Sequence, residues 1–207
     1  MNIFRDECLE CHALVELSST GRPRKFCSNA CRQRNYRKSL KLVTVDSNPI
    51  PVELRDRARW ILHVAKRPIA LGGWWSSVKD ETTWMTYGEA RDAVAREDTK
   101  ADGLGFVLNG DGVICLDLDD CVEGGEPNVF AREFVRALGD TYVEFSPSGR
   151  GLHVWGFGSM SKGRVFAGGN LKVEVYPDKR FITMTGRPYR DGGLGQLDIT
   201  NALRLVA

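Results

Sequence analysis

Two aspartates at the end of an apolar run are the residues best placed to do chemistry. Asp117 and Asp119 follow the apolar residues 113–116, and Leu118 separates them. The run is short and is entered from a glycine turn, which predicts a buried β-strand with both aspartates on one face, roughly 6.6 Å apart. Burying unpaired carboxylates costs several kcal/mol each, so the pair indicates a divalent metal site. A solvated strand end with a chance pair of aspartates is the alternative.

Two further segments are expected to converge on these aspartates. In residues 146–153, Gly149 and Gly151 allow close approach to a ligand, Arg150 can pair with phosphate, and His153 follows on a strand. In residues 172–176, two valines face the core, which leaves Lys172, Glu174 and Tyr176 on the other face. Three carboxylates on adjacent strands are what two-metal phosphoryl transfer requires.

Four cysteines near the N-terminus predict a structural zinc site. Cys8 and Cys11 are separated by two residues, Cys27 and Cys31 by three, and fifteen residues lie between the pairs. This spacing supplies four thiolates for tetrahedral zinc, with Ser28 capping a helix that reaches about residue 40 in a treble-clef-like knuckle. His12 is an alternative ligand, and disulfides are the alternative chemistry.

The chain of 207 residues has a net charge of +2 that is unevenly distributed. Residues 1–45 hold nine Lys or Arg against four Asp or Glu, whereas the rest hold twenty against twenty-three. A basic block of this kind predicts contact with a polyanion, and a solvated helix face is the alternative. The candidate DNA-binding residues are Arg22, Arg24, Lys25, Arg32, Arg34, Arg37 and Lys38.

The order of the remaining elements predicts an α+β domain over residues 52–207, after a zinc knuckle at 1–41 and a proline-containing linker at 42–51. We expect the main helix on one face of a sheet and the acidic site on the other. The expected helices are a short one within 52–59, one from the Thr86 capping box to about residue 96, and an amphipathic one at 128–138 with Phe130, Phe134 and Leu138 inward. The expected strands are Trp60–Val64, 103–108, the aspartate strand, 141–145, Leu152–Phe157, Leu171–Tyr176 and 181–185.

Some connections can also be predicted. Residues 66–84 are expected to form a loop, and the turn at 109–112 a hairpin that returns into the aspartate strand. Leu171–Tyr176 and 181–185 are expected to form a final hairpin. His63 and Cys115 are interpreted as core residues.

Three of these motifs, in this order, resemble the archaeo-eukaryotic primase superfamily. They are Leu116 to Asp119, Ser146 to His153, and Val173 to Tyr176 followed by residues 180–186. The match is to its bifunctional primase-polymerase (prim-pol) branch of phages and plasmids, over about residues 52–200. Residues 8–37 separately resemble a small cysteine knuckle.

The resemblance implies an α/β unit packed on an RRM-like antiparallel sheet, and an enzyme that joins nucleotides on single-stranded DNA. Asp117, Asp119 and Glu174 would then hold Mg²⁺ or Mn²⁺ as catalytic ligands. Ser148, Gly149, Arg150, Gly151, His153 and Arg180 would bind the NTP or dNTP. It further implies a separate replicative helicase, because no fused helicase segment follows.

Two other functions remain open from sequence. One is a non-catalytic nucleic-acid-binding protein with a degenerate prim-pol-like domain, and the other is a two-metal phosphoesterase or nuclease. The sequence shows no signal-peptide pattern at its start and no apolar run of about 18 residues. We therefore expect a protein of the bacterial host cytoplasm, with reduced cysteines and no membrane partner.

Overall fold

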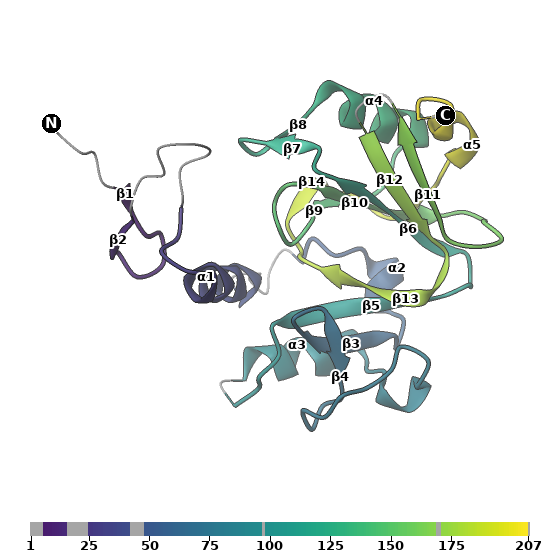
Figure 1. Cartoon of the computed structure of the whole chain (residues 1–207). Helices are drawn as coiled ribbons and strands as arrows, with labels where there is room; N and C mark the ends of the chain where they lie inside the picture. Colours follow the sequence, from purple (N-terminus) through teal and green to yellow (C-terminus); the bar gives the residue numbers. More distant parts are fainter. Residues whose placement is uncertain (1–5, 16–24, 42–47, 97, 169–170, 207) are drawn as a thin grey trace, which may run out of the picture. The chain divides into compact units, whose positions relative to one another are not determined.

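The computed structural model describes residues 6–15, 25–41, 48–96, 98–168 and 171–206, without the side chains of Asp6 and residues 36–41. The chain divides into two compact units, Met1–Thr44 and Val45–Ala207, each described here by itself (Figure 1). Within the described ranges, no helix is long and apolar enough to cross a membrane.

The small unit has very little apolar core. Strands β1 (Asp6–Glu7) and β2 (Leu14–Val15) pair antiparallel, and helix α1 (Asn29–Lys41) follows. The helix begins as the sequence predicts, because the Cys31 amide donates to Ser28 Oγ at 3.2 Å. The buried residues of its apolar cluster are Cys8, Val15 and Cys31, with Phe26 packed against them. A unit with so few apolar contacts needs another source of stability.

The large unit contains a four-stranded sheet in the order β13-β5-β3-β4. Its strands are β3 (Trp60–Val64), β4 (Arg67–Ile69), β5 (Gly103–Asn109) and β13 (Asp178–Met184). Helices α2 (Val52–Arg55) and α3 (Tyr87–Ala95) and the 3-10 helix η1 (Glu81–Thr83) accompany it. The Thr86 capping box is confirmed: its hydroxyl accepts from the Glu89 amide, and Glu89 accepts from the Thr86 amide at 2.9 Å.

A second sheet runs in the order β11-β12-β6-β10-β9-β14, with β15 beside β10. Its strands are β6 (Val113–Asp119), β9 (Val143–Phe145), β10 (Leu152–Phe157), β11 (Arg164–Gly168), β12 (Leu171–Tyr176), β14 (Pro188–Arg190) and β15 (Gly195–Gln196). A small hairpin joins β7 (Val122–Glu123) to β8 (Glu126–Pro127). Helices α4 (Val129–Leu138) and α5 (Ile199–Leu203) complete the unit. The protein is therefore α+β and rich in sheet.

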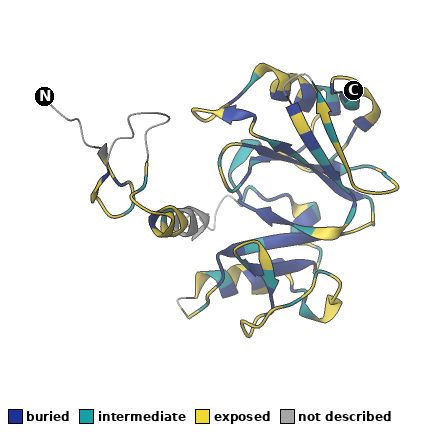
Figure 2. Cartoon of the chain, in the orientation of Figure 1, coloured by how far each residue is buried: buried dark blue, intermediate teal, exposed yellow. Residues whose placement is uncertain are grey.

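The two faces of the second sheet have different environments. Alternate residues of β6, namely Ile114, Leu116 and Leu118, share a buried cluster with α4 and α5. Val113 and Cys115 face the other way and share a cluster with the four-stranded sheet. Figure 2 shows the central strands buried along most of their length. By strand alternation, Asp117 and Asp119 lie on the face opposite α4, as the sequence predicts.

Two predicted hairpins are wrong. The turn at residues 109–112 leads from β5 in one sheet into β6 in the other, and the turn after Tyr176 leads from β12 into β13 in the same way. Both edges of β5 are bonded to β13 and β3, and both edges of β12 to β11 and β6. Neither strand has a free edge for its successor, so each turn carries the chain between sheets.

Two smaller predictions also need correction. The segment 66–84 is not a plain loop, because it contains β4 and η1. Phe130 is 39% exposed rather than inward, and the buried residues of α4 are Ala131, Phe134, Val135 and Leu138. The Asn128 side chain caps α4 through the Ala131 amide at 2.9 Å. The buried residues follow a spacing of three and four, which defines one helix face, and Phe130 lies at its edge.

Candidate functional site

Four titratable side chains form one row across the second sheet. Asp117 on β6 is paired directly with Glu174 on β12 and with His153 on β10, and His153 is paired with Glu144 on β9. Directly opposed residues of antiparallel strands point to the same face. The register therefore places Glu174, Asp117, His153 and Glu144 side by side. The expectation that three separate motifs meet on one face agrees with this register.

A lysine ammonium lies between two of the carboxylates. Lys172, opposite Asp119 in the register, places its Nζ 2.6 Å from Asp119 Oδ2 and 2.5 Å from Glu174 Oε1. Hydrogen bonds from Lys172 and then Tyr176 lower the pKa of Glu174. Asp119 and Glu174 thus both contact one ammonium group. Their carboxylate oxygens can therefore bind a positively charged group at this position.

Asp117 has the opposite electrostatic environment. Burial raises the pKa of Asp117; the neighbouring His153 opposes this shift, and the charges of Asp119 and Glu174 add to it. Positive charge placed beside this carboxylate would favour its ionised form. Hard divalent cations prefer carboxylate oxygens, so Asp117, Asp119 and Glu174 are chemically suited to Mg²⁺ or Mn²⁺.

The glycine loop packs against the end of the aspartate strand. Gly149 has a φ of +70°, and a Cβ at Gly151 would lie 2.3 Å from the Leu118 carbonyl oxygen. Ser146 Oγ accepts from the Gly151 amide at 3.1 Å, and Ser148 Oγ accepts from the Arg150 amide at 3.2 Å. Only glycine fits at position 151, where the loop contacts the backbone of the aspartate strand. The loop therefore lies beside the end of that strand.

Two predicted nucleotide-binding arginines have protein partners. Arg150 pairs with Asp120 at 2.5 Å, and both side chains are exposed. Arg180 on β13 places its guanidinium 4.8 Å from the centre of the Tyr176 ring, and its charge is among the causes that lower the pKa of Glu174. Arg180 is thus a residue of the four-stranded sheet whose side chain lies beside the acidic residues of the second sheet.

Sequence reasoning missed Glu144 and the contacts of Lys172. Glu144 is fully buried on β9, and its Oε1 lies 3.2 Å from His153 Nδ1. The signal was present, because Glu144 stands between apolar residues in the same way as Glu174. Two other core interpretations are confirmed: Cys115 is buried, and burial lowers the pKa of the buried His63 to about 4.

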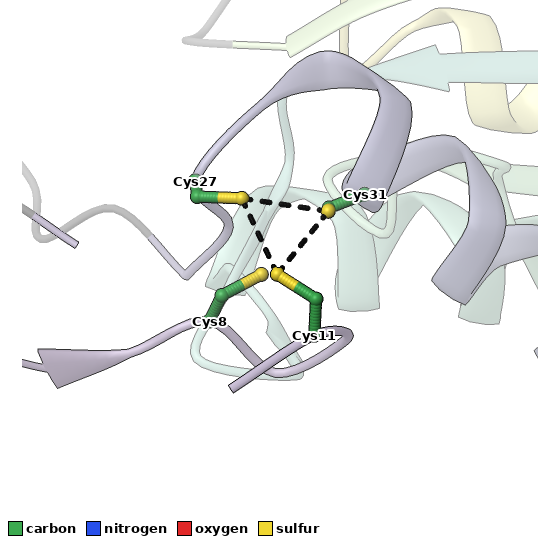
Figure 3. A group of neighbouring side chains, drawn as sticks. All are labelled: Cys8, Cys11, Cys27 and Cys31. Carbon is green, nitrogen blue, oxygen red and sulfur yellow. Dashed lines mark hydrogen bonds between the residues drawn. The ribbon is translucent and has the colours of Figure 1, made fainter. Parts of the chain in front are cut away.

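The four predicted zinc ligands meet in the small unit. The sulfur atoms of Cys8, Cys11, Cys27 and Cys31 all lie within 4.8 Å of one another, and three of their separations are 3.4 to 3.6 Å (Figure 3). A tetrahedron with zinc–sulfur bonds of about 2.3 Å has sulfur atoms about 3.8 Å apart. All four cysteines are free thiols, so the disulfide alternative is not what the structure shows. The cluster therefore fits a zinc ion.

The surroundings lower the pKa of two of the cysteines, Cys8 and Cys31, whereas the hydrogen bonds with Cys31 and then Cys11 raise the pKa of Cys27 to about 12. Burial would raise the pKa of Cys8, but backbone amides of Cys27, Cys11 and Glu10 lower it to about 6. The Ser28 hydroxyl lowers the pKa of Cys31. His12 is exposed and lies 3.8 Å from Glu7, outside the cluster, so it does not replace a cysteine here.

The predicted DNA-binding residues have different environments. Lys25 and Arg32 are exposed. Arg34 donates to Cys31 Sγ at 3.0 Å, which makes it a partner of the cysteine cluster. Arg22 and Arg24, and the side chains of Arg37 and Lys38, lie outside the described residues.

No family model matches the chain. The chain is 30% identical over 156 residues to a DNA primase-polymerase of Nitratiruptor phage NrS-1. The matched segment covers 69% of this chain and 21% of that relative, so the chain corresponds to about a fifth of the phage protein. The chain is thus distantly similar to one part of a phage DNA primase-polymerase.

Proposed function

We propose that the large unit transfers nucleotides to a 3′-hydroxyl on a single-stranded DNA template, as a primase-polymerase of phage or plasmid type. The observation that carries the proposal is the register that places Asp117 between His153 and Glu174, with Asp119 and Glu174 both paired with the ammonium of Lys172. The α+β architecture and the distant similarity to a phage primase-polymerase support it.

In this proposal each motif has one task. Asp117, Asp119 and Glu174 would hold Mg²⁺ or Mn²⁺, which lowers the pKa of the attacking hydroxyl and neutralises charge on the leaving pyrophosphate. The loop at residues 148–151 offers amide donors and a hydroxyl to the triphosphate. His153 donates to it from Nε2, which lies 3.8 Å from Asp117. Arg150 leaves its ion pair with Asp120 and pairs with a phosphate of the nucleotide instead. Arg180 adds positive charge beside Glu174.

The direct test uses the full chain with single-stranded DNA, Mn²⁺ or Mg²⁺, and labelled NTPs or dNTPs, with and without a primer. Labelled product that grows with template length supports the proposal. Shortening of the DNA without nucleotide incorporation would assign the acids to a nuclease. DNA binding with neither activity would make the chain a binding protein. The same assay compares NTPs with dNTPs.

Substitutions in the glycine loop are expected to weaken nucleotide binding. Arg150→Ala and His153→Ala should each raise KM for the nucleotide about 10- to 100-fold, because a hydrogen bond to a charged group contributes about 1.5–3 kcal/mol. Steady-state kinetics with one nucleotide varied measures the effect. Arg96→Ala is a matched control, since Arg96 also pairs with an exposed aspartate, at 2.7 Å. Unchanged KM in both loop variants would assign the loop another task.

The basic residues of the small unit are expected to hold the template. Replacing Lys25, Arg32 and Arg37 with glutamine should weaken binding to single-stranded DNA. It should also make the plot of log binding constant against log salt concentration less steep, by about 0.7 for each DNA phosphate that is no longer neutralised. Arg34 is kept because of its contact with Cys31. Fluorescence anisotropy at several salt concentrations gives the slope.

The matched control for this triple variant replaces three exposed arginines of the large unit, Arg91, Arg96 and Arg204, with glutamine. It changes the net charge equally and should leave the slope unchanged. If both triple variants weaken binding alike, the knuckle has no special role in holding DNA.

A further inference from the structure

Glu144 is a carboxylate without exposure to solvent. Its side chain is 0% exposed on the short strand β9, between Val143 and Phe145. A buried carboxylate remains in a protein only when hydrogen bonds satisfy its oxygens. Glu144 therefore needs donors, and the structure supplies them.

Four donor atoms lie within hydrogen-bond distance of one oxygen of Glu144. Oε2 accepts from the backbone amides of Thr185 at 3.0 Å and Gly186 at 2.9 Å, and from the hydroxyls of Thr185 at 3.0 Å and Tyr142 at 3.2 Å. The two amides follow β13 directly, so this carboxylate links the end of the four-stranded sheet to β9 in the second sheet. Backbone amides can only donate, which fixes this oxygen as an acceptor.

The other oxygen faces the imidazole of the candidate site. Glu144 Oε1 lies 3.2 Å from His153 Nδ1, while His153 Nε2 lies 3.8 Å from Asp117 Oδ1 on the opposite side of the ring. The ring is 5% exposed, so its orientation is set by these neighbours. An ionised carboxylate has no proton to donate, and the Nδ1 atom must then carry one.

We propose that Glu144 is a positioning residue that keeps the proton of His153 on Nδ1 and turns Nε2 toward the nucleotide. The inference rests on the proposed function, because it names the group that orients one of its phosphate-binding residues. The contact at Nδ1 fixes the rotation of the buried ring, so Nε2 is the ring atom on the side of Asp117. Glu144 itself does not reach the substrate.

The first test reads the ring protons directly and needs no catalysis. The chain has three histidines, so long-range ¹H–¹⁵N spectra of the full-length protein can be assigned by replacing each with glutamine. We expect a proton on Nδ1 of His153. A neutral Glu144 that donates to Nδ1 would leave that nitrogen without a proton, and this result would overturn the proposal.

The second test reverses the hydrogen bond. In Glu144→Gln, the amide oxygen should accept from the Thr185 and Gly186 amides, which turns the NH₂ group toward His153. The ring must then accept on Nδ1 and carry its proton on Nε2. A Glu144→Gln protein that keeps the Nδ1 proton contradicts the proposal. If this variant does not fold, the wild-type spectrum decides alone.

Two controls separate positioning from general loosening. Tyr142→Phe removes one donor to Glu144 and leaves the His153 contact intact, so the proton should stay on Nδ1. For nucleoside triphosphate binding in Mn²⁺, Glu144→Gln should weaken affinity about 5- to 10-fold, the difference between a charged and a neutral hydrogen bond. In a His153→Gln background the same change should have little effect. An equal loss in both backgrounds assigns Glu144 a purely structural role.

These measurements also separate the positioning role of Glu144 from the proposed nucleotidyl transfer. An Nδ1 proton on His153, together with weaker triphosphate binding in Glu144→Gln, supports the positioning role even if no nucleotide is joined to DNA. In that case it is the proposed nucleotidyl transfer that fails.

Discussion

Asp117→Asn is expected to reduce nucleotidyl transfer about 10³-fold or more, with the fold intact. The substitution keeps the shape of the side chain and removes one ligand charge between His153 and Glu174. A metal-centred reaction depends on several kcal/mol of charge stabilisation, and each 1.36 kcal/mol is a factor of about ten in rate. Asp119→Asn and Glu174→Gln should have losses of similar size, since all three acids belong to the same proposed ligand set. Single-turnover incorporation on a primed template measures the loss.

The control for this loss is Asp140→Asn, a fully exposed acid of the same unit that lies 3.8 Å from Arg190. It should retain full activity. Thermal unfolding should show no loss of stability in Asp117→Asn near neutral pH. The raised pKa of Asp117 means that the folded state favours its protonated form, so its contribution to stability falls as pH rises from its unfolded pKa through the folded value. Persistent polymerisation in all three acid variants would show that the active site has been misplaced.

Removal of zinc is expected to unfold the small unit almost completely. Three buried residues form its apolar cluster, and two of them are the candidate ligands Cys8 and Cys31. Zinc binding to small domains contributes about 10–16 kcal/mol at neutral pH, far more than such a core supplies. A strong chelator should therefore abolish the helical signal of α1 and the dispersed NMR resonances of residues 6–15 and 25–41. Elemental analysis of protein purified without chelator should give one zinc per chain.

Cys27→Ser should reproduce the effect of the chelator. Cys121→Ala serves as its control, because Cys121 is buried in the large unit beside the Leu118 carbonyl and belongs to no cysteine cluster among the described residues. The control should retain its zinc, and both variants should keep the main thermal transition of residues 45–207. A zinc-free protein with an intact α1 would refute a structural metal.

Local sequence patterns predicted many individual elements. The Thr86 capping box, the Ser28 cap and the strand at Trp60–Val64 all depend on residues close together in the chain. The alternation in β6 likewise predicted which side chains share a face. Short strands such as β4, β14 and β15 gave no recognisable period because they span only two or three residues.

Long-range pairing could not be predicted from these patterns. Glycines at 110 and 112 with positive φ indicate a change of direction, but they do not say which sheet the next strand joins. That outcome depends on which edges of β5 and β12 are already bonded. The role of Glu144 was hidden for the same reason, because its donors Thr185 and Gly186 lie some forty residues further along the chain.

Under the proposed function, a divalent ion at the acidic face exchanges places with the ammonium of Lys172. Its exposed ammonium already neutralises part of the charge of Asp119 and Glu174, so a divalent ion that binds there must displace a tethered monovalent one. Exposed ion pairs contribute little to stability, because solvent screens them, and the lysine can leave without unfolding the strand. The affinity for a free divalent ion then reflects only the difference between its interaction with the two acids and that of the lysine ammonium. An ion that arrives with a triphosphate has the further advantage that the released ammonium gains a phosphate as its new counter-ion.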